Sequence, residues 1–140
     1  MVAKYYIDAA VNCVFIRHEG EFIAGEGPEN MGEILVDADY RAGMGFLRDA
    51  SRTKLPAEFG YEYFKRMQSQ RMGGIEKQLG GCKMAWLVDN GHDFAVVHQL
   101  SVSQRLTPDA IERRPFRDIE AALEWLGLPM DYELKFPENQ

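Results

Sequence analysis

The sequence predicts an α/β fold in which a mixed, largely parallel sheet is flanked by helices. Two strand-like runs come first, helical and strand-like patterns then alternate, and an amphipathic helix comes near the end of the chain. This order is typical of one sheet with helices packed against it. The chain has 140 residues, close to the commonest size of a domain, and shows no repeat and no linker-like segment. We therefore expect residues 1–140 to form a single domain.

The first predicted element is a β-hairpin. Residues 5–8 and 13–18 are rich in the aromatic and β-branched side chains that favour strands. A short turn region around Ala10 and Asn12 separates the two runs. Two such runs joined by a short turn are typical of a hairpin.

A helix is predicted next. Pro28 suits the first turn of a helix, where its missing N–H has no intrahelical partner. Apolar residues then recur at the i, i+3, i+4 and i+7 spacing of one helix face. They are Met31, Ile34, Leu35 and Ala38. Gly43 and Gly45 predict the end of this segment.

Residues 46–50 are predicted to form a strand that ends in the polar stretch 51–54, and Pro56 is expected to start a second helix. Residues 59–79 hold more aromatic residues and methionines than a solvent-exposed helix needs. Such a surplus indicates a partner surface, a pocket for an apolar ligand or an ordinary thick core.

The nearly all-apolar run 83–88 is typical of a central strand covered on both faces. Residues 94–102 fit two patterns. A strand would alternate at Phe94, Val96, His98, Leu100 and Val102. A helix would place Phe94, Val97, His98 and Ser101 on one face. Periodicity leaves both interpretations open.

The last two elements have stronger local patterns. Residues 113–116 are predicted to form a brief strand, and Pro115 confines it to a sheet edge because proline has no N–H to donate. Asp118 is a preferred N-cap for the final helix, and Gly127 predicts its end. The apolar face of this helix consists of Ile119, Ala122, Leu123 and Leu126. Residues 130–140 are expected to pack on the surface.

The composition excludes several classes of protein. Apolar residues make up 46% and charged residues 27%, as in an ordinary globular protein. The net charge of −6 and the scattered Lys and Arg residues lack the basic face of a nucleic-acid binder. No apolar run approaches the roughly 20 residues that span a bilayer, and the first residues are unlike a signal peptide. We expect a cytoplasmic protein with no nucleic-acid partner and no integral membrane segment.

Three segments carry a resemblance to a known fold family. They are residues 46–51, the apolar strand 84–88 that ends in Asp89, and the closing segment 116–126 with Phe-Arg-Asp before Ala-Leu-Glu-Trp-Leu. In this order they resemble the SpoIIAA-like, or STAS-like, families. The resemblance spans most of the chain. The resemblance implies a helix for residues 94–102.

The resemblance also implies relatives of two kinds. Anti-sigma-factor antagonists bind a kinase-like partner and are switched by serine phosphorylation, and other domains of related fold bind lipids in an apolar pocket. The antagonists carry Asp-Ser at the start of the helix after the middle strand. Here residues 54–57 read Lys-Leu-Pro-Ala, and the nearest hydroxyls, Ser51 and Thr53, lie upstream. The phosphorylation switch is therefore not carried over.

Polar residues gather where two predicted strands end. Ligands of open α/β sheets bind beyond the carboxyl ends of the parallel strands, where loops and helix N-termini converge. The predicted ligand or partner surface consists of Asp49, Ser51, Arg52, Thr53, Asp89 and His92. If the two strands are neighbours, these side chains form one patch.

The residue types in this patch suit two chemistries in part. Ser51 with His92 as base, oriented by Asp89 or Asp49, would make a hydrolase-like site, but the sequence has no Gly-x-Ser-x-Gly elbow. Asp at such positions equally suits helix caps and turns. Arg52 beside a helix N-terminus would favour an anion, but no phosphate-binding glycine motif is present. No catalytic residue is therefore assigned.

No cofactor and no metal site are predicted. Cys13 and Cys82 stand far apart with no paired cysteine or adjacent histidine, so we expect both to be reduced, buried and apolar in behaviour. The three histidines are distant from one another, and His98 lies in an apolar stretch.

The first hypothesis is a non-enzymatic regulatory or protein-interaction domain of the STAS-like type. It would bind a protein partner or a second copy of the chain through residues 49–53 and the helix after Pro56. The alternative is a carrier of a small apolar or lipid-like ligand, motivated by residues 59–79. A weaker alternative is a hydrolase-like enzyme that uses Ser51 and His92.

Overall fold

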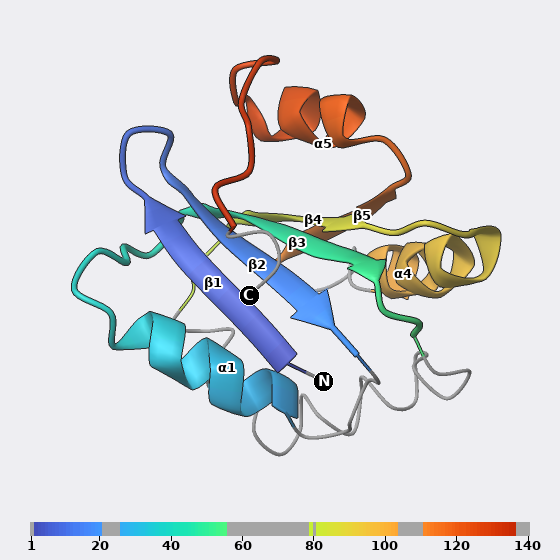
Figure 1. The fold of residues 1–140 in the computed structure, drawn as a ribbon, viewed down its shortest axis with the longest axis horizontal. Coiled ribbons are helices and arrows are strands. Elements are labelled where there is room, and N and C mark those ends of the chain that lie inside the picture. Colours follow the sequence, from blue (N-terminus) through green and yellow to red (C-terminus); the bar gives the residue numbers. More distant parts are fainter. Residues whose placement is uncertain (1, 21–25, 56–78, 80, 104–110, 137–140) are drawn as a thin grey trace.

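The computed structural model describes residues 2–20, 26–55, 79, 81–103 and 111–136. These residues form a five-stranded sheet whose strand order follows the chain, and one strand at the edge runs antiparallel to its neighbour (Figure 1). The strands are β1 (Val2–Asp8), β2 (Cys13–Glu19), β3 (Gly45–Arg52), β4 (Lys83–Leu87) and β5 (Glu112–Phe116). Strands β2 to β5 are parallel. The predicted mixed, largely parallel sheet is confirmed.

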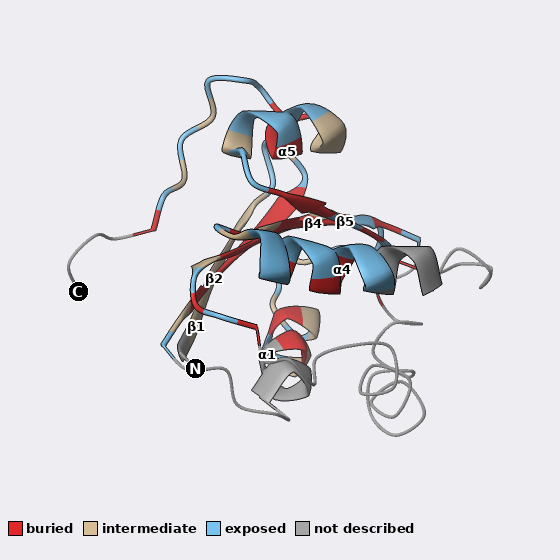
Figure 2. Cartoon of the chain, turned by 90° about the vertical axis from the view of Figure 1, so that its right-hand side faces the viewer, coloured by how far each residue is buried: buried red, intermediate tan, exposed pale blue. Residues whose placement is uncertain are grey.

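The helices divide between the two faces of the sheet. α1 (Glu26–Leu35) lies in the chain between β2 and β3, and α4 (Gly91–Ser103) between β4 and β5. Right-handed crossovers that each advance by one strand place their helices on the same face. Figures 1 and 2 show α1 and α4 below the sheet and α5 (Ile119–Leu126) above it. We call these two sides the α1/α4 face and the α5 face.

The predicted hairpin is confirmed. β1 and β2 pair from Val2 opposite Glu19 to Asp8 opposite Cys13. The Asp8 carboxylate accepts the Ala10 backbone N–H at 3.1 Å. Asn12 adopts a φ of 55°, a left-handed conformation that asparagine tolerates better than most residues. Local turn chemistry therefore closes the hairpin.

The helix predicted around Met31 forms but ends earlier than expected. Its last residue is Leu35, and Ala38, predicted on its apolar face, is exposed. The reason is Asp37, whose carboxylate accepts the Asp39 backbone N–H at 2.9 Å. Such a turn competes with helix continuation, because the side chain satisfies a backbone group that the helix would otherwise use.

Each face of the sheet buries its own hydrophobic cluster (Figure 2). Alternate residues of a strand point to opposite faces, so one strand feeds both clusters. The α1/α4 face buries, among others, Val14, Ile16, Met31, Ile34, Phe46, Met84 and Trp86. The α5 face buries Cys13, Phe15, Leu47, Ala85, Phe116, Ala122, Leu123, Leu128 and Phe136. Both cysteines are buried and reduced, as predicted.

The C-terminal segment is part of the core, so the expectation that it packs on the surface was wrong. Phe136 is buried in the cluster of the α5 face, with Tyr132 and Leu134 packed against it. The Tyr132 ring stacks on Phe15 with centroids 4.9 Å apart. Its hydroxyl donates to the Asp8 carboxylate at 2.9 Å. Apolar alternation at 132, 134 and 136 was the overlooked signal.

The remaining predictions divide by region. Residues 94–102 belong to α4, so the helical interpretation is correct. Pro115 lies in β5 at the edge of the sheet, and Asp118 caps α5 by accepting the Glu120 N–H. The helix expected after Pro56 and nearly all of residues 59–79 fall outside the described residues. None of the helices in the described ranges is long and apolar enough to cross a membrane.

Candidate functional site

The two predicted groups of polar residues lie at the end of the sheet toward which β3 and β4 run. β3 and β4 are neighbours, and the Cα of Asp49 is paired with that of Leu87. The residues that follow each strand therefore leave the sheet side by side. We call this region the carboxyl edge.

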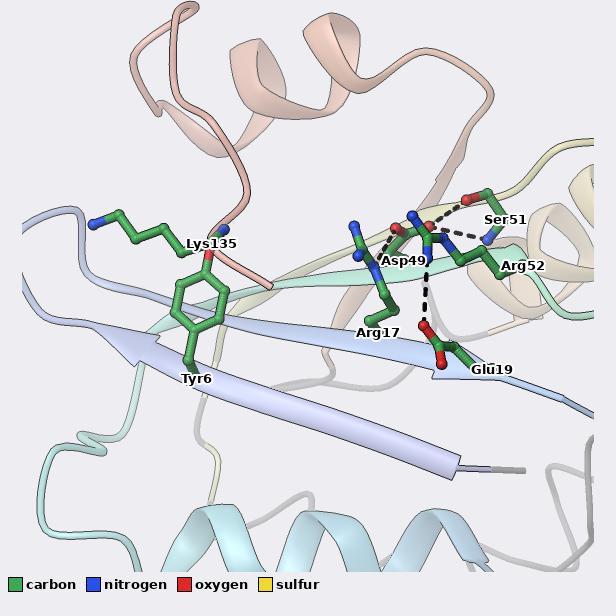
Figure 3. Close-up of polar contacts among 7 residues, drawn as sticks. All are labelled: Tyr6, Arg17, Glu19, Asp49, Ser51, Arg52 and Lys135. Atoms are coloured by element: carbon green, nitrogen blue, oxygen red, sulfur yellow. Dashed lines mark hydrogen bonds and ion pairs between the residues drawn. The ribbon is translucent and has the colours of Figure 1, made fainter. Parts of the chain in front are cut away.

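Asp49 is held in a buried ion pair. The Arg17 Nε donates to its Oδ2 at 3.2 Å, and the two side chains are 7% and 4% exposed. The Ser51 backbone N–H and hydroxyl both donate to its Oδ1, at 3.1 and 2.5 Å (Figure 3). The Arg17 guanidinium also lies 4.6 Å from the centroid of the Phe136 ring. Asp49 is thus a fixed structural carboxylate on the α5 face.

Arg52 and Thr53 tie the end of β3 to the end of β2. Arg52 Nη1 lies 3.4 Å from a carboxylate oxygen of Glu19, in an exposed pair (Figure 3). The buried Thr53 hydroxyl donates to the Gly20 carbonyl. Of the four residues predicted at this strand end, Arg52 is exposed and Ser51 is half-buried, whereas Asp49 and Thr53 are buried.

The start of α4 is organised by Asp93, which the sequence analysis did not single out. Asp93 is almost fully buried, and its two carboxylate oxygens each accept the Leu55 backbone N–H at 3.3 Å. Its own N–H donates to the Asn90 side-chain oxygen at 2.8 Å. This spacing is a capping-box pattern with Asp in place of Glu, and it was readable as Asn90-x-x-Asp93.

Asp89 and His92 sit at the solvent-facing part of the carboxyl edge. Asp89 is exposed and its carboxylate accepts the Asn90 amide at 2.7 Å. The His92 side chain is exposed as well, and its Nδ1 lies 3.1 Å from Asp93 Oδ1. The predicted capping role therefore belongs to Asn90 and Asp93, with Asp89 outside the cap.

The geometry does not assemble a nucleophile with a base. Ser51 donates its hydroxyl to Asp49, whereas His92 pairs with Asp93. A Ser-His-Asp site requires the serine hydroxyl on the imidazole, with the carboxylate on the other ring nitrogen. Each polar group is instead engaged by a structural neighbour.

A second group of polar residues lies on the α1/α4 face and was missed by the sequence analysis. Arg48 on β3 is one residue before Asp49 and therefore points to the opposite face. Its Cζ lies 4.6 Å from the centroid of the Trp86 ring on β4. The His18 ring on β2 stacks parallel to the same indole, with centroids 6.0 Å apart and planes 8° apart. We call Arg48, His18 and Trp86 the inner cluster.

The inner cluster is electrostatically unusual. His18 is 3% exposed and Arg48 8% exposed. Burial, and then the Arg48 charge, lowers the pKa of His18 to about 3. Burial, and then the charge of buried Arg113, lowers the pKa of Arg48 to about 9. At neutral pH the cluster thus holds a charged guanidinium and an uncharged imidazole.

The carbon environment of the inner cluster is apolar. Ile16, Phe46, Val88 and Val97 belong to the same buried cluster as Trp86. No group of three or more potential metal ligands occurs among the described residues. The donors of the inner cluster suit an anion better than a cation, because a guanidinium can only donate hydrogen bonds.

Comparison with protein-family models and with curated proteins gave no match to this chain.

Proposed function

We propose that the chain is a non-enzymatic regulatory or protein-interaction domain of the STAS-like type. The observation that carries this proposal is the carboxyl edge, where Ser51 and His92 each hydrogen bond to a different structural carboxylate. Such groups position loops and do not supply a nucleophile with its base. Exposed groups remain for a partner to contact.

The proposed contact surface lies on and beside α4. Phe94 is 37% exposed and stacks on His98 with ring centroids 6.5 Å apart. Arg52 and Asp89 are exposed at the adjacent carboxyl edge. Aromatic residues rimmed by polar groups are typical of interface centres. A second copy of the chain is the first partner to test.

The test is the subunit count by native mass spectrometry and multi-angle light scattering over a wide concentration range. We expect a dimer that Phe94→Ser converts to a monomer. Val36→Ser is the matched control, because Val36 is an exposed apolar residue beyond the end of α1. A monomer at every concentration would count against the second copy as partner.

A second candidate function is supported by the inner cluster. A carrier of a small, largely apolar ligand with one polar head would leave buried polar groups unsatisfied until that head binds. The Arg48 Nε and both ring nitrogens of His18 are buried without a hydrogen-bond partner in the described part of the chain. Native mass spectrometry of freshly purified protein tests this function, since a retained small molecule would add its mass to the chain.

A further inference from the structure

Arg48 and His18 combine deep burial with unused hydrogen-bonding capacity. Arg48 Nε and both nitrogens of His18 have no hydrogen-bond partner among the described residues; they lie on the α1/α4 face, His18 near the carboxyl end of β2 and Arg48 in the middle of β3. Buried polar groups in folded proteins are nearly always hydrogen bonded, and exceptions point to a function or to a missing partner. Three such atoms in two neighbouring side chains therefore call for a partner from outside the chain.

The missing partner is an anion. Among the described residues no carboxylate forms an ion pair with Arg48, and the charge that acts on it is the like charge of Arg113. Asp93 is the buried carboxylate of the adjacent helix, but its oxygens are used by Leu55, Asn90 and His92. A buried cation is tolerated when a counter-charge is supplied.

We propose that Arg48 and His18 bind the oxyanion head of a small organic acid whose apolar body packs on the α1/α4 face. This inference rests on the carrier function proposed above and names its ligand class. A guanidinium presents parallel N–H donors that match the two oxygens of a carboxylate. A neutral imidazole adds one further N–H donor.

Trp86 orients the two donors. Its indole holds the Arg48 guanidinium on its ring and stacks parallel to His18. Ala50, on the strand between His18 and Trp86, contributes only a methyl group to this face. The donors are thereby held before a ligand arrives, which lowers the entropy cost of binding.

The surroundings favour an organic acid over an inorganic anion. Ala3, Tyr5 and Ile7 of β1 are half-buried apolar residues packed against the cluster that holds Trp86, and Ala3 is the Cα partner of His18. An apolar body gains from contact with such side chains, whereas a fully hydrated phosphate loses its water without that gain. A single carboxylate also carries less charge to desolvate than a phosphate dianion.

The experiment compares matched probes on the full chain after bound small molecules are removed. Isothermal titration calorimetry is run with straight-chain carboxylates from hexanoate to dodecanoate, with the primary alcohols of equal length, and with inorganic phosphate. We expect a carboxylate to bind about tenfold or more tightly than its alcohol. In Arg48→Met the carboxylate should fall to the affinity of the alcohol, and Arg48→Lys should retain part of the preference.

Arg114→Met is the matched control, because Arg114 is an exposed arginine of β5 whose guanidinium lies over Phe116 on the α5 face. It should leave the preference for the carboxylate unchanged. Equal binding of acid and alcohol would overturn the anion site and leave the carrier function standing. Phosphate binding as tightly as every organic acid would overturn the organic-acid class. Absence of binding by all probes, with no retained mass in native spectra, would overturn both proposals.

Discussion

Arg17 and Arg48 are both buried arginines of adjacent strands, yet within the described residues Arg17 pairs with a carboxylate and Arg48 does not. The Cα partner of Arg17 is Asp49, which is the residue after Arg48. The Asp49 carboxylate therefore pairs with Arg17 on the α5 face, where Arg17 Nε and Asp49 Oδ2 are 3.2 Å apart. The Asp49 side chain points away from Arg48, which lies on the α1/α4 face. One face of the sheet thus buries an arginine with a carboxylate partner, and the other buries an arginine without one among the described residues. This contrast yields two predictions.

Arg17→Met should destabilise the protein by about 3 kcal/mol, because it leaves the Asp49 carboxylate buried without its counter-charge. The free energy of unfolding from urea titration measures the effect. Arg52→Met, which removes the exposed partner of Glu19, should cost less than about 1 kcal/mol. Equal losses for the two variants would show that burial of the ion pair is unimportant.

Arg48→Met should raise the stability of the ligand-free protein by about 1 to 2 kcal/mol. The substitution removes a buried charge and keeps a flexible apolar side chain of comparable length. Thermal unfolding of ligand-depleted samples should show a midpoint a few degrees higher. A lower midpoint would mean that Arg48 has a stabilising partner in the free protein.

Because of His18, the free energy of unfolding should decrease as the pH is lowered from 6.5 to about 3. Its folded pKa of about 3 lies below the ordinary value of 6.5, so in this window the unfolded chain binds a proton that the folded chain does not. The contribution is complete above pH 6.5 and is lost as the pH falls, by at most about 1.4 kcal/mol per pH unit. His18→Phe, which keeps a ring against Trp86, should have a shallower profile. Superimposable pH profiles of wild type and variant would contradict the assignment.

Asp93→Ala should destabilise the protein by about 2 to 3 kcal/mol. It removes the acceptor of the buried Leu55 N–H and the carboxylate that accepts the Asn90 side-chain amide at the start of α4. His92→Ala, which changes only the exposed partner of Asp93, should stay within about 0.5 kcal/mol of wild type. Chemical denaturation compares the two, and a large loss in His92→Ala would reassign the organising role.

Phe136→Ala should cost about 3 kcal/mol, because Phe136 fills the core of the α5 face and packs on Tyr6 and Arg17. Met130→Ala, an exposed position in the same segment, should be nearly neutral. If both variants unfold at the same denaturant concentration as wild type, the C-terminal segment is not part of the stabilising core.

Local patterns predicted much of this fold. The hairpin, the edge strand with Pro115 and the helix between Asp118 and Gly127 are specified by turn, edge and capping residues, which act over a few positions. Periodicity could not decide residues 94–102, because Phe94 and His98 are both exposed on α4 while the adjacent Val96 and Val97 are both buried. The buried residues Asp93, Val96 and Val97 follow the i, i+3, i+4 spacing of one helix face, but a search for apolar periodicity misses this face because Asp93 is charged.

The candidate site was harder to predict, because it depends on which strands are neighbours. Asp49 lies within β3, three residues before its end, and Asp89 comes two residues after β4, whereas the arginine that pairs with Asp49 comes from β2, far away in the sequence. The inner cluster joins β2, β3 and β4 through His18, Arg48 and Trp86. In the sequence, these three residues are distinguished by nothing except their polar or aromatic side chains within predicted strands.

The contact between the Tyr6 and Tyr132 hydroxyls, 3.1 Å apart across 126 positions of sequence, also orders events during synthesis. The α5 face over β1 and β2 is closed by residues 132–136, which are synthesised after the strands that they cover. A nascent chain that stops before them would present Phe15 and its neighbours to water, an adhesive surface for other chains. Closure of so distant a contact slows folding, because a long loop must be ordered first. We expect the growing chain to depend on chaperones until residues 132–136 have docked.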